Sequence, residues 1–446
     1  MSAIVSRLAF SYGPALALAG MLWLPSVASQ SSSITANESF VFVERGGVLY
    51  QFDAESLELI QRVKIAQAEK RLLAKLARAK NARRKQQVEA ELAEEEAVLA
   101  EPAPDGTSTE RVRGAISQGL TWLATHQDEN GRWDSDGFMK HDQGAKVDGA
   151  GGATQDIGVT SLAVLAMLCD GNTPNAGPYA KNVKRGLAWL RSQQQPDSGL
   201  IGTNAAHDFI YGHAIATWAL SEGLLLTEDE SMRKSVELAA GYLASHRNPY
   251  MAWRYQPRDN DNDTSVTGWG IAAVIAGRDF GLRIHSDALE MAGVWIQQVT
   301  SRQGRAGYSK RGEPPQRESR ELAEQFPPAA SESLTAIALA SVLQLGSVSV
   351  ESSLVQRRAD LLLAKLPAWR APPDSGNDLY YWFFASQALR AVGGKPWQQW
   401  QAALQSALLG AQRTDGGAAG SWDPVCAWGS IGGRVYSTAL AILALQ

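Results

Sequence analysis

The sequence predicts an all-α fold in which six helical hairpins close into a ring between Arg111 and Gln446. The first observation is a hairpin pattern that recurs across this part of the chain with a period of roughly 50 to 60 residues. The second is a difference within each hairpin: the first helix is apolar at helical spacing, whereas the second is rich in Ala, Gly and small apolar residues. Helices that are apolar on all sides are buried. We therefore expect six outer helices around six inner ones.

The outer helices are expected at residues 111–127, 179–194, 230–245, 286–300, 352–366 and 397–412. The inner helices are expected to open near Asp156, Asp208, Asp263, Ser331, Asp378 and Arg434. Between the helices of a hairpin lies a Gly-rich or Pro-rich link with a late aromatic residue, as in residues 127–133 and 412–422. Glycine lets the chain reverse, while the link's Gln and indole bind the neighbouring hairpin and lock consecutive units together.

Residues 1–110 differ from the repeats. Residues 1–29 hold an apolar run that ends in small residues, typical of a secretory signal peptide or, alternatively, of an uncleaved anchor. Residues 38–54 alternate around two glycines and predict a β-hairpin. Residues 55–100 predict a long charged helix, which is either a solvated spacer or coiled coil, or a contact to a membrane or partner. Residues 101–110 read as a linker to the ring at 111–446.

Composition limits the function. With 446 residues, 45% of them hydrophobic, the chain can bury a large core. The net charge of -4 argues against general nucleic-acid binding, and no Gly-rich phosphate-binding loop occurs. Cys169 and Cys426 are too few for a disulfide framework or a thiolate metal cage. We expect no cofactor, and an exported protein that is periplasmic or membrane-anchored and faces outside the cytoplasm.

Residues 127–133 have the spacing Q-x3-G-x-W, and residues 412–422 form a looser copy. These segments resemble the QW repeats of squalene cyclases and the related protein prenyltransferase β-subunits. Further strings resemble the bacterial single-toroid members of this family: DTSVTGW at 263–269, DLYYWFFA at 378–385 and GSWDP at 420–424. The resemblance covers the chain from Arg111 to its end and implies an α6/α6 toroid, the fold of terpenoid cyclases.

The resemblance also directs the search for chemistry. Cyclases of this family protonate an alkene with an acidic D-x-D-D run, whose central acid is kept protonated by its surroundings. The matching stretch here retains Asp263 as the last acid, but Asn262 and Asn260 replace the central and first acids. Asp261 could substitute only if the loop shifts register. The prenyltransferases use Asp, Cys and His zinc ligands, and the matching segment at Asp378 has no Cys or His nearby, so no metal is expected.

The inner helices of such a ring run parallel, so their N-termini meet at one rim and polar residues there share one pocket. The candidate catalytic residues are the carboxylates of Asp263, Asp261 and Asp378. The candidate ligand-binding residues are His207, His213, Asp156, Trp269, Tyr381, Arg434 and Tyr436. Alternatives stay open, because aspartate is a favoured helix N-cap in any protein, histidine can be a satisfied core residue, and aromatic rings can fill a barrel.

An insertion at residues 311–330 interrupts the fourth hairpin and is charged and Pro-flanked. Because it lies at the end of the hairpins that leads into the inner helices, it is expected to be a lid over the rim, a partner-binding loop or a mobile decoration.

Two functions from different classes fit the sequence. The first is an exported prenyltransferase/squalene-cyclase-like repeat protein whose cavity binds an apolar isoprenoid or lipid, or a peptide, as a binding or assembly module. The second is a terpenoid cyclase or transferase-type enzyme that acts on an isoprenoid through its rim carboxylates. The expected partners are the ligand, a membrane surface reached through the N-terminal region, and a second copy through residues 55–100, with no nucleic acid.

Overall fold

A computed structural model describes residues 33–36, 40–45, 48–53, 59–64, 106–144, 146–227, 229–249, 251–279, 286–371 and 376–446. The chain divides into an N-terminal unit, Ser6–Glu110, and a second unit that holds Arg111–Gln446 with Met1–Val5. The signal peptide or anchor expected at residues 1–29 lies outside the described residues. So does the expected charged helix beyond residue 64, up to residue 100.

Four antiparallel strands in the order β1-β2-β3-β4 make up the described part of the N-terminal unit. Their bounds are Ser33–Ala36, Phe40–Arg45, Val48–Asp53 and Leu59–Lys64. Strands β2 and β3 pair on either side of two glycines, with Arg45 opposite Val48. The charged helix expected from Glu55 is wrong at its start, because β4 pairs with β3 there. Ile60 and Val63 are β-branched and favour a strand wherever a neighbouring strand offers its edge.

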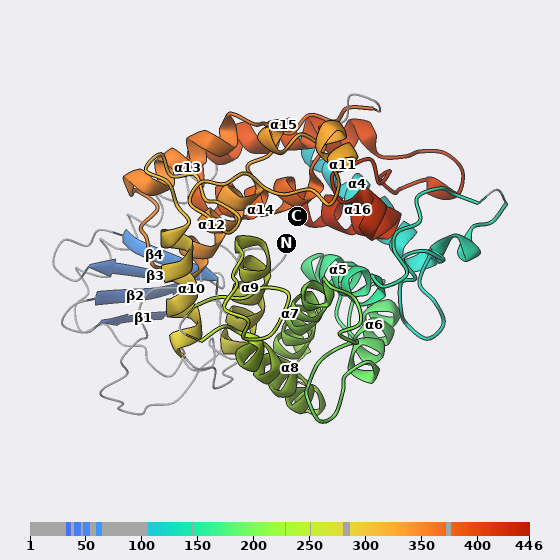
Figure 1. The fold of residues 1–446 in the computed structure, drawn as a ribbon, viewed down its shortest axis with the longest axis horizontal. Coiled ribbons are helices and arrows are strands. Elements are labelled where there is room, and N and C mark those ends of the chain that lie inside the picture. Colours follow the sequence, from blue (N-terminus) through green and yellow to red (C-terminus); the bar gives the residue numbers. More distant parts are fainter. Residues whose placement is uncertain are drawn as a thin grey trace. The chain divides into compact units, whose positions relative to one another are not determined.

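The second unit is the predicted all-α ring, and its arrangement is confirmed. The outer helices are α4 (Gly106–Thr125), α6 (Ala180–Ser192), α8 (Arg233–His246), α10 (Ser286–Gln298), α13 (Ser353–Leu363) and α15 (Gly394–Ala411). The inner helices are α5 (Asp156–Cys169), α7 (Phe209–Thr227), α9 (Thr264–Asp279), α12 (Ser333–Gln344), α14 (Leu379–Val392) and α16 (Gly429–Leu445). Figure 1 shows the inner set around a common axis with the outer set outside it. Each inner helix contacts the next, and α16 contacts α5, so the ring closes.

Two helix starts differ from the expectation by five residues. Helix α4 begins at Gly106 and not at Arg111, so the expected linker at residues 101–110 ends earlier. Helix α16 begins at Gly429, ahead of the expected start at Arg434, because two helical segments join across Gly433. Gly433 has a φ of 70°, a left-handed value that glycine adopts without strain. The sequence pattern detected only the second segment.

Small residues let the inner helices pack closely. All residues of α5 from Val159 to Cys169 are buried, as expected for a helix that is apolar on every side. Gly268 on α9 faces Ile337 on α12, and a β-carbon at Gly268 would lie 2.3 Å from the Ile337 side chain. A larger residue at position 268 would therefore force α9 and α12 apart, which explains the glycine there.

The indole anchors expected in the links are present. Trp133, Trp253 and Trp422 are completely buried. Each donates its indole N–H to a carbonyl near the end of the preceding outer helix, Leu123 at 2.7 Å, Leu243 at 2.9 Å and Leu408 at 2.8 Å. A carbonyl at a helix end has no partner within its helix. In these three links the carbonyl accepts the N–H of the residue that follows the helix, and the indole adds a second hydrogen bond. The rings of Trp133 and Trp422 also reach the next outer helix, at Gly186 and Gly119.

The link glutamines join consecutive hairpins. Each donates from its side-chain amide once to its own link and once to the next outer helix. Gln127 bonds Gly131 and Asn182, Gln194 bonds Gly199 and Ser235, and Gln412 bonds Gly420 and Ala115. The bond from Gln412 to Ala115 connects the last hairpin to the first. The interpretation of these glutamines as locks between units is thus supported by their hydrogen bonds.

A third repeated contact is made by side chains on five inner helices, α5, α7, α9, α12 and α16. Thr160, Thr267, Thr335 and Thr438 accept hydrogen bonds from link backbone N–H groups. In the second hairpin His213 takes this place, and its Nδ1 accepts from the Ile201 N–H at 3.0 Å. These contacts hold five links against the inner helices that follow them.

No single helix among the described residues is both long and apolar enough to cross a membrane; the pair Arg320–Ala330 and Ser333–Gln344, bent by 56°, meets the criterion only by combined length and composition.

Candidate functional site

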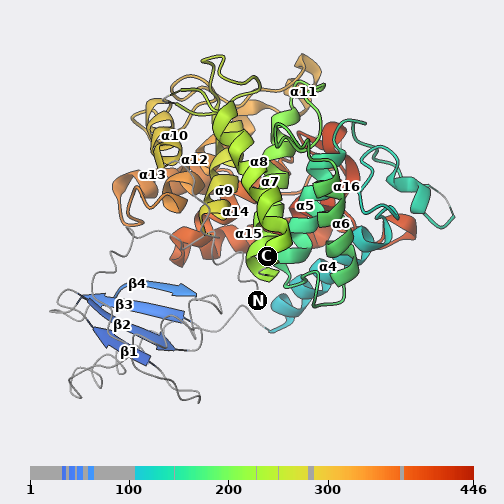
Figure 2. The same cartoon turned by 90° about the horizontal axis from the view of Figure 1, so that it is seen from below.

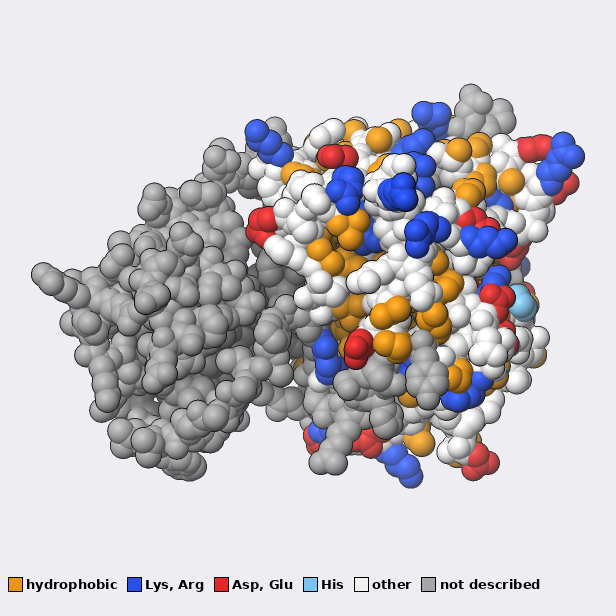
Figure 3. Space-filling view, turned by 60° about the vertical axis from the view of Figure 1, so that its left-hand side comes forward, with side chains coloured by type: hydrophobic (Ala, Val, Ile, Leu, Met, Phe, Trp, Pro, Cys, Tyr) orange, Lys and Arg blue, Asp and Glu red, His pale blue; other side chains and the backbone are white. Residues whose placement is uncertain are grey.

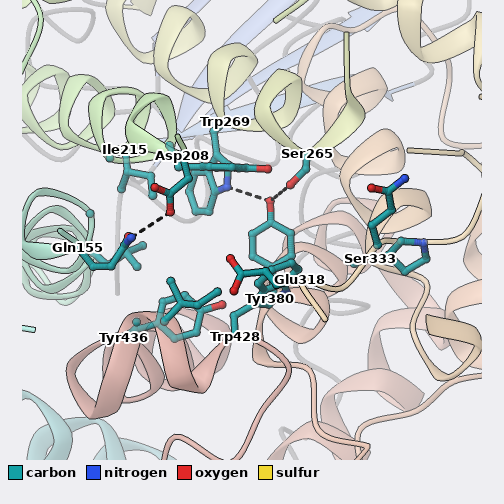
Figure 4. A pocket seen from close by; sticks show the side chains of 18 of the residues that line it. Gln155, Asp208, Ile215, Ser265, Trp269, Glu318, Ser333, Tyr380, Trp428 and Tyr436 are labelled. Atoms are coloured by element: carbon teal, nitrogen blue, oxygen red, sulfur yellow. Dashed lines mark hydrogen bonds between the residues drawn. The ribbon is translucent and has the colours of Figure 1, made fainter. Parts of the chain in front are cut away.

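A cavity of about 250 Å³ lies among the N-terminal halves of the inner helices. Its wall combines residues from all six inner helices, two links and the insertion. The lining residues include Gln155, Val159, Asp208, Tyr211, Ile215, Tyr255, Ser265, Trp269, Tyr308, Pro315, Gln316, Arg317, Glu318, Ser333, Tyr380, Trp428, Ile431 and Tyr436. Figure 4 shows them converging on one space. Of the predicted site residues, Trp269 and Tyr436 line this cavity.

An aromatic network forms one side of the cavity. The Trp269 indole N–H donates to the Tyr380 hydroxyl at 2.9 Å, and the Ser265 hydroxyl lies 2.7 Å from the same oxygen (Figure 4). Trp269 also stacks on Phe383, with ring centroids 5.6 Å apart. Burial raises the pKa of the Tyr380 phenol, so it stays neutral. The wall is therefore aromatic and uncharged here, with its polar atoms paired to each other.

Four residues of the insertion, Pro315 to Glu318, also line the cavity; we call them the strap. The adjacent helix α11 (Arg320–Gln325) lies at one end of the inner helices in Figure 2, where the ring is seen from the side. The insertion thus forms part of the cavity wall, as a lid over the rim would. No signal within the sequence distinguished the four strap residues from the rest of the insertion.

Arg317 fastens the strap to the ring. Its guanidinium lies 3.1 Å from the Asp378 carboxylate, and the two side chains are only 2% and 3% exposed. It also donates to the Phe326 carbonyl and lies 5.6 Å from the centroid of the Trp428 ring. Asp378 in turn accepts the Tyr381 N–H at 3.0 Å, which is the N-cap hydrogen bond of α14. Both Asp378 oxygens are therefore engaged, one as a cap and one in a buried ion pair.

Asp263 is completely buried at the N-cap of α9. Its Oδ1 accepts the Val266 N–H at 2.7 Å, and its Oδ2 accepts the Tyr308 hydroxyl at 3.3 Å. Burial raises the pKa of the Asp263 carboxyl to about 7, against the lowering effects of the Val266 N–H and the Arg254 guanidinium. The Tyr308 hydroxyl is also 2.7 Å from the Tyr255 hydroxyl. Because both tyrosines line the cavity, they connect this carboxyl to it.

Asp261 and His207 occupy the outer surface near this site. The Asp261 side chain is 58% exposed and pairs with Arg254. His207 is exposed and its ring lies 4.2 Å from the Tyr255 ring. Neither residue lines the cavity. Asp261 therefore lies beside Arg254 and outside the cavity wall.

His213 is a buried residue whose ring nitrogens are both bonded. Nδ1 accepts from the Ile201 N–H, which leaves Nε2 as the protonated nitrogen that donates to the Ala239 carbonyl at 3.2 Å. Burial lowers the pKa of His213 to about 3. The side chain does not line the cavity. Its surroundings match the alternative of a satisfied core histidine, and we leave it out of the proposed site.

Asp156 belongs to an ionic cluster beside the ring's first link. Its carboxylate contacts Arg132 at 2.7 Å and accepts the Ser135 N–H at 2.9 Å, while burial raises its pKa. Asp134, Asp136 and Asp156 lie close enough together to hold a cation. However, Arg132 and Lys140 already contact the Asp134 carboxylate, at 2.8 and 2.7 Å. Arg132 and Lys140 therefore supply positive charge to this cluster of carboxylates.

Tyr381 and Arg434 point away from the cavity. The Tyr381 hydroxyl donates to the Leu362 carbonyl on α13 at 2.8 Å, and its ring packs edge-on against Trp400 on α15. Arg434 donates to the Asp148 carbonyl and pairs with Asp423 at 2.7 Å, so it ties two loops together. Within the aromatic run at 380–384, only Tyr380 lines the cavity. Successive helical residues point about 100° apart, which is why its neighbour faces the outer ring.

Three residues of this wall were not predicted from the sequence. Arg317 and Glu318 lie in a charged insertion without any repeat to mark them. Tyr211 lies one turn into α7, where its burial raises the pKa of its phenol, and it was not singled out from the sequence. Its helical position, three residues after Asp208, would have placed it on the same face as that rim residue.

Neither a protein-family model nor a curated protein sequence matches this chain. Among solved structures, the unsaturated glucuronyl hydrolase from Bacillus sp. GL1 is 15% identical, and the match covers 75% of this chain and 96% of that chain with a TM-score of 0.51. An unsaturated glucuronyl hydrolase specific for heparin is 12% identical, with the same coverage and a TM-score of 0.51. The type II terpene cyclase MstE from Scytonema is 15% identical over 75% of this chain and 97% of that chain, with a TM-score of 0.48.

At these identities the two hydrolases show the fold and nothing about activity. The predicted all-α ring of helical hairpins is confirmed at the level of the fold. The second unit of this chain is an α6/α6 toroid.

Proposed function

We propose that the protein is a binding module whose cavity holds an elongated apolar small molecule, an isoprenoid or another lipid. The observation that carries the proposal is the chemistry of the cavity wall. Aromatic and aliphatic side chains dominate it, among them Trp269, Tyr380, Trp428, Val159 and Ile215. A concave, mostly apolar site with a few polar groups is the usual form of a small-molecule site.

The pairing of the one positive charge in the described part of the cavity wall also supports an apolar ligand. The only cation among the described lining residues is Arg317, and it is already paired with Asp378. Each methylene that leaves water contributes about 0.8 kcal/mol to binding. After the cost of association, a short isoprenoid chain is expected to bind with a dissociation constant of about 1–100 μM.

Calorimetric titration of the full-length chain with geraniol tests this proposal. Val159→Trp fills the cavity from α5 and is expected to abolish binding, because the indole occupies the space that the chain needs. Lys184→Trp adds the same side chain at an exposed position of α6 and is expected to bind like the wild type. If Val159→Trp does not fold, Ile431→Trp repeats the test from α16. Equal affinity in the wild type and in a folded filled variant would contradict the proposal.

Export is part of the proposal. It rests on the apolar run and the small residues of segment 1–29. The mass of the protein isolated from the cell envelope tests it, since removal of the segment shortens the chain at its N-terminus. Recovery of the full-length chain in the cytoplasmic fraction alone would contradict it.

A second candidate, proton-transfer chemistry on an isoprenoid, is favoured by Asp263. A carboxyl with a pKa of about 7 is substantially protonated at neutral pH and can act as an acid. Tyr308 lies between this carboxyl and the cavity. In a relay, the phenol gives its proton to the ligand while it receives the Asp263 proton, so no phenolate forms. Product analysis of a polyprene incubated with the wild type, Asp263→Asn and Tyr308→Phe tests this; turnover that both variants retain would exclude it.

A further inference from the structure

Two carboxylates line the cavity, one on Asp208 before α7 and one on Glu318 in the strap; Asp208 is half-buried and Glu318 is exposed. Asp208 accepts one hydrogen bond, from the Gln155 side-chain amide at 2.9 Å. Within the described part of the ring, neither carboxylate has an ion-pair partner. Figure 4 shows both directed into the enclosed space. A ligand in the cavity therefore meets two uncompensated negative charges.

No positive charge in the wall is available to an anionic ligand. Arg317 is the one Lys or Arg side chain among the described lining residues. Its guanidinium is held by the Asp378 carboxylate and the Phe326 carbonyl, and its face lies over Trp428. On the outside, Figure 3 shows Lys and Arg side chains interleaved with apolar and polar ones over one face of the ring. A phosphate within the cavity would thus face carboxylates without a free cation.

A third group also indicates a ligand with a polar atom. The Tyr436 hydroxyl is shielded from solvent and has no hydrogen-bond partner among the described residues, although the tyrosine lines the cavity. Burial raises the pKa of this phenol well above its usual value, so it remains a neutral donor and acceptor. A buried hydroxyl without a partner is costly, and a polar group of the ligand would satisfy it.

We propose that the cavity selects amphipathic ligands whose head group is an amine or a hydroxyl, and excludes ligands whose head group is a phosphate or diphosphate. This inference rests on the proposed binding function and narrows its ligand class. Asp208 and Glu318 accept hydrogen bonds from the head group and attract a cationic one, while the apolar wall holds the chain. The same two charges repel a phosphate head, which no free arginine or lysine offsets.

Three probes with one hydrocarbon chain test the inference: geranylamine, geraniol and geranyl monophosphate. Each is titrated calorimetrically into the full-length chain at low ionic strength, where charge effects are least screened. We expect geranylamine to bind at least about tenfold more tightly than the monophosphate, with geraniol between them. In Asp208→Asn/Glu318→Gln this ratio is expected to fall to about two or less, while geraniol affinity stays within about threefold.

The matched control is Glu321→Gln/Glu324→Gln, which removes the same charge from α11, none of whose residues lines the cavity. It is expected to keep the wild-type ratio. A monophosphate that binds as tightly as the amine would overturn the head-group inference and leave apolar binding intact. An equal change of the ratio in both double variants would overturn its assignment to Asp208 and Glu318. Absence of binding by all three probes would refute the proposed binding function itself.

Discussion

Substitution of Asp263 by Asn is expected to remove a pH dependence of stability that the buried carboxyl creates. Asn caps a helix about as well as Asp, so the hydrogen bond to the Val266 N–H is retained. The substitution removes the titratable proton of the Asp263 carboxyl. The carboxyl of the folded chain has a pKa of about 7, against 3.8 for an ordinary aspartate. The folded state therefore holds this proton to a higher pH than the unfolded state does.

The direction and the size of the change in stability with pH follow from this difference in pKa. Between about pH 4 and pH 7 the unfolded state has lost the proton that the folded state retains, so a rise in pH favours unfolding. Each pKa unit corresponds to about 1.4 kcal/mol, and a difference of about three units gives about 4 kcal/mol at most. The wild type is expected to lose this amount relative to Asp263→Asn as the pH rises from about 4 to about 8.

Urea unfolding, followed by tryptophan fluorescence at several pH values, measures the difference between the two proteins. His213, whose pKa of about 3 makes the folded chain lose stability as the pH falls from 6.5 toward 3, is present in both and cancels. Asp261→Asn is the control, because that side chain is exposed and its removal should leave the wild-type slope. A difference between the wild type and Asp263→Asn that does not change with pH would refute the reasoning about this carboxyl.

Three further substitutions test the strap, the ring closure and the cavity. Arg317→Met should lower the free energy of unfolding in urea by about 3–5 kcal/mol, because it leaves the buried Asp378 carboxylate unpaired. Arg320→Met, which removes an exposed ion pair of the same insertion, should lower it by less than about 1 kcal/mol. Similar losses in the two variants would contradict the role of the buried Arg317–Asp378 pair. Gln412→Ala should cost about 1–3 kcal/mol in the same assay, since two carbonyls lose a donor, and no loss would show that the closure bond is dispensable. Tyr436→Phe should raise the stability of the ligand-free protein, because it removes a buried hydroxyl that has no partner among the described residues, but should weaken geraniol binding about two- to tenfold in calorimetry; unchanged affinity would mean that the hydroxyl does not meet the ligand.

The ring could be predicted because its determinants repeat. The apolar period, the link glycines and the pairing of Gln127 with Trp133 recur along the chain, so each copy supports the others. The rim position of Asp263 and the cavity position of Trp269 follow from the same parallel arrangement of helices. The N-terminal sheet was predicted only around its central glycines, because the strand at Leu59–Lys64 depends on a neighbour that the local pattern does not reveal.

The site was predicted less completely, since helix rotation decides which side of a rim residue faces inward. His213 and Tyr381 lie on inner helices as expected, yet each points into the packing between helices. A shift of one residue turns a side chain by about 100°, and the sequence pattern does not fix rotation that finely. Arg317 could not be predicted at all, because its role depends on where a single insertion folds back onto Asp378.

The central claim, that the toroid holds an apolar small molecule, is tested most directly by native mass spectrometry with lipid extraction on protein purified from its own cell envelope. We predict that the wild type retains an extractable apolar compound and that Val159→Trp, purified in the same way, does not. An empty wild-type ring, a bound polypeptide, or the same compound recovered equally from a folded Val159→Trp variant would contradict the claim.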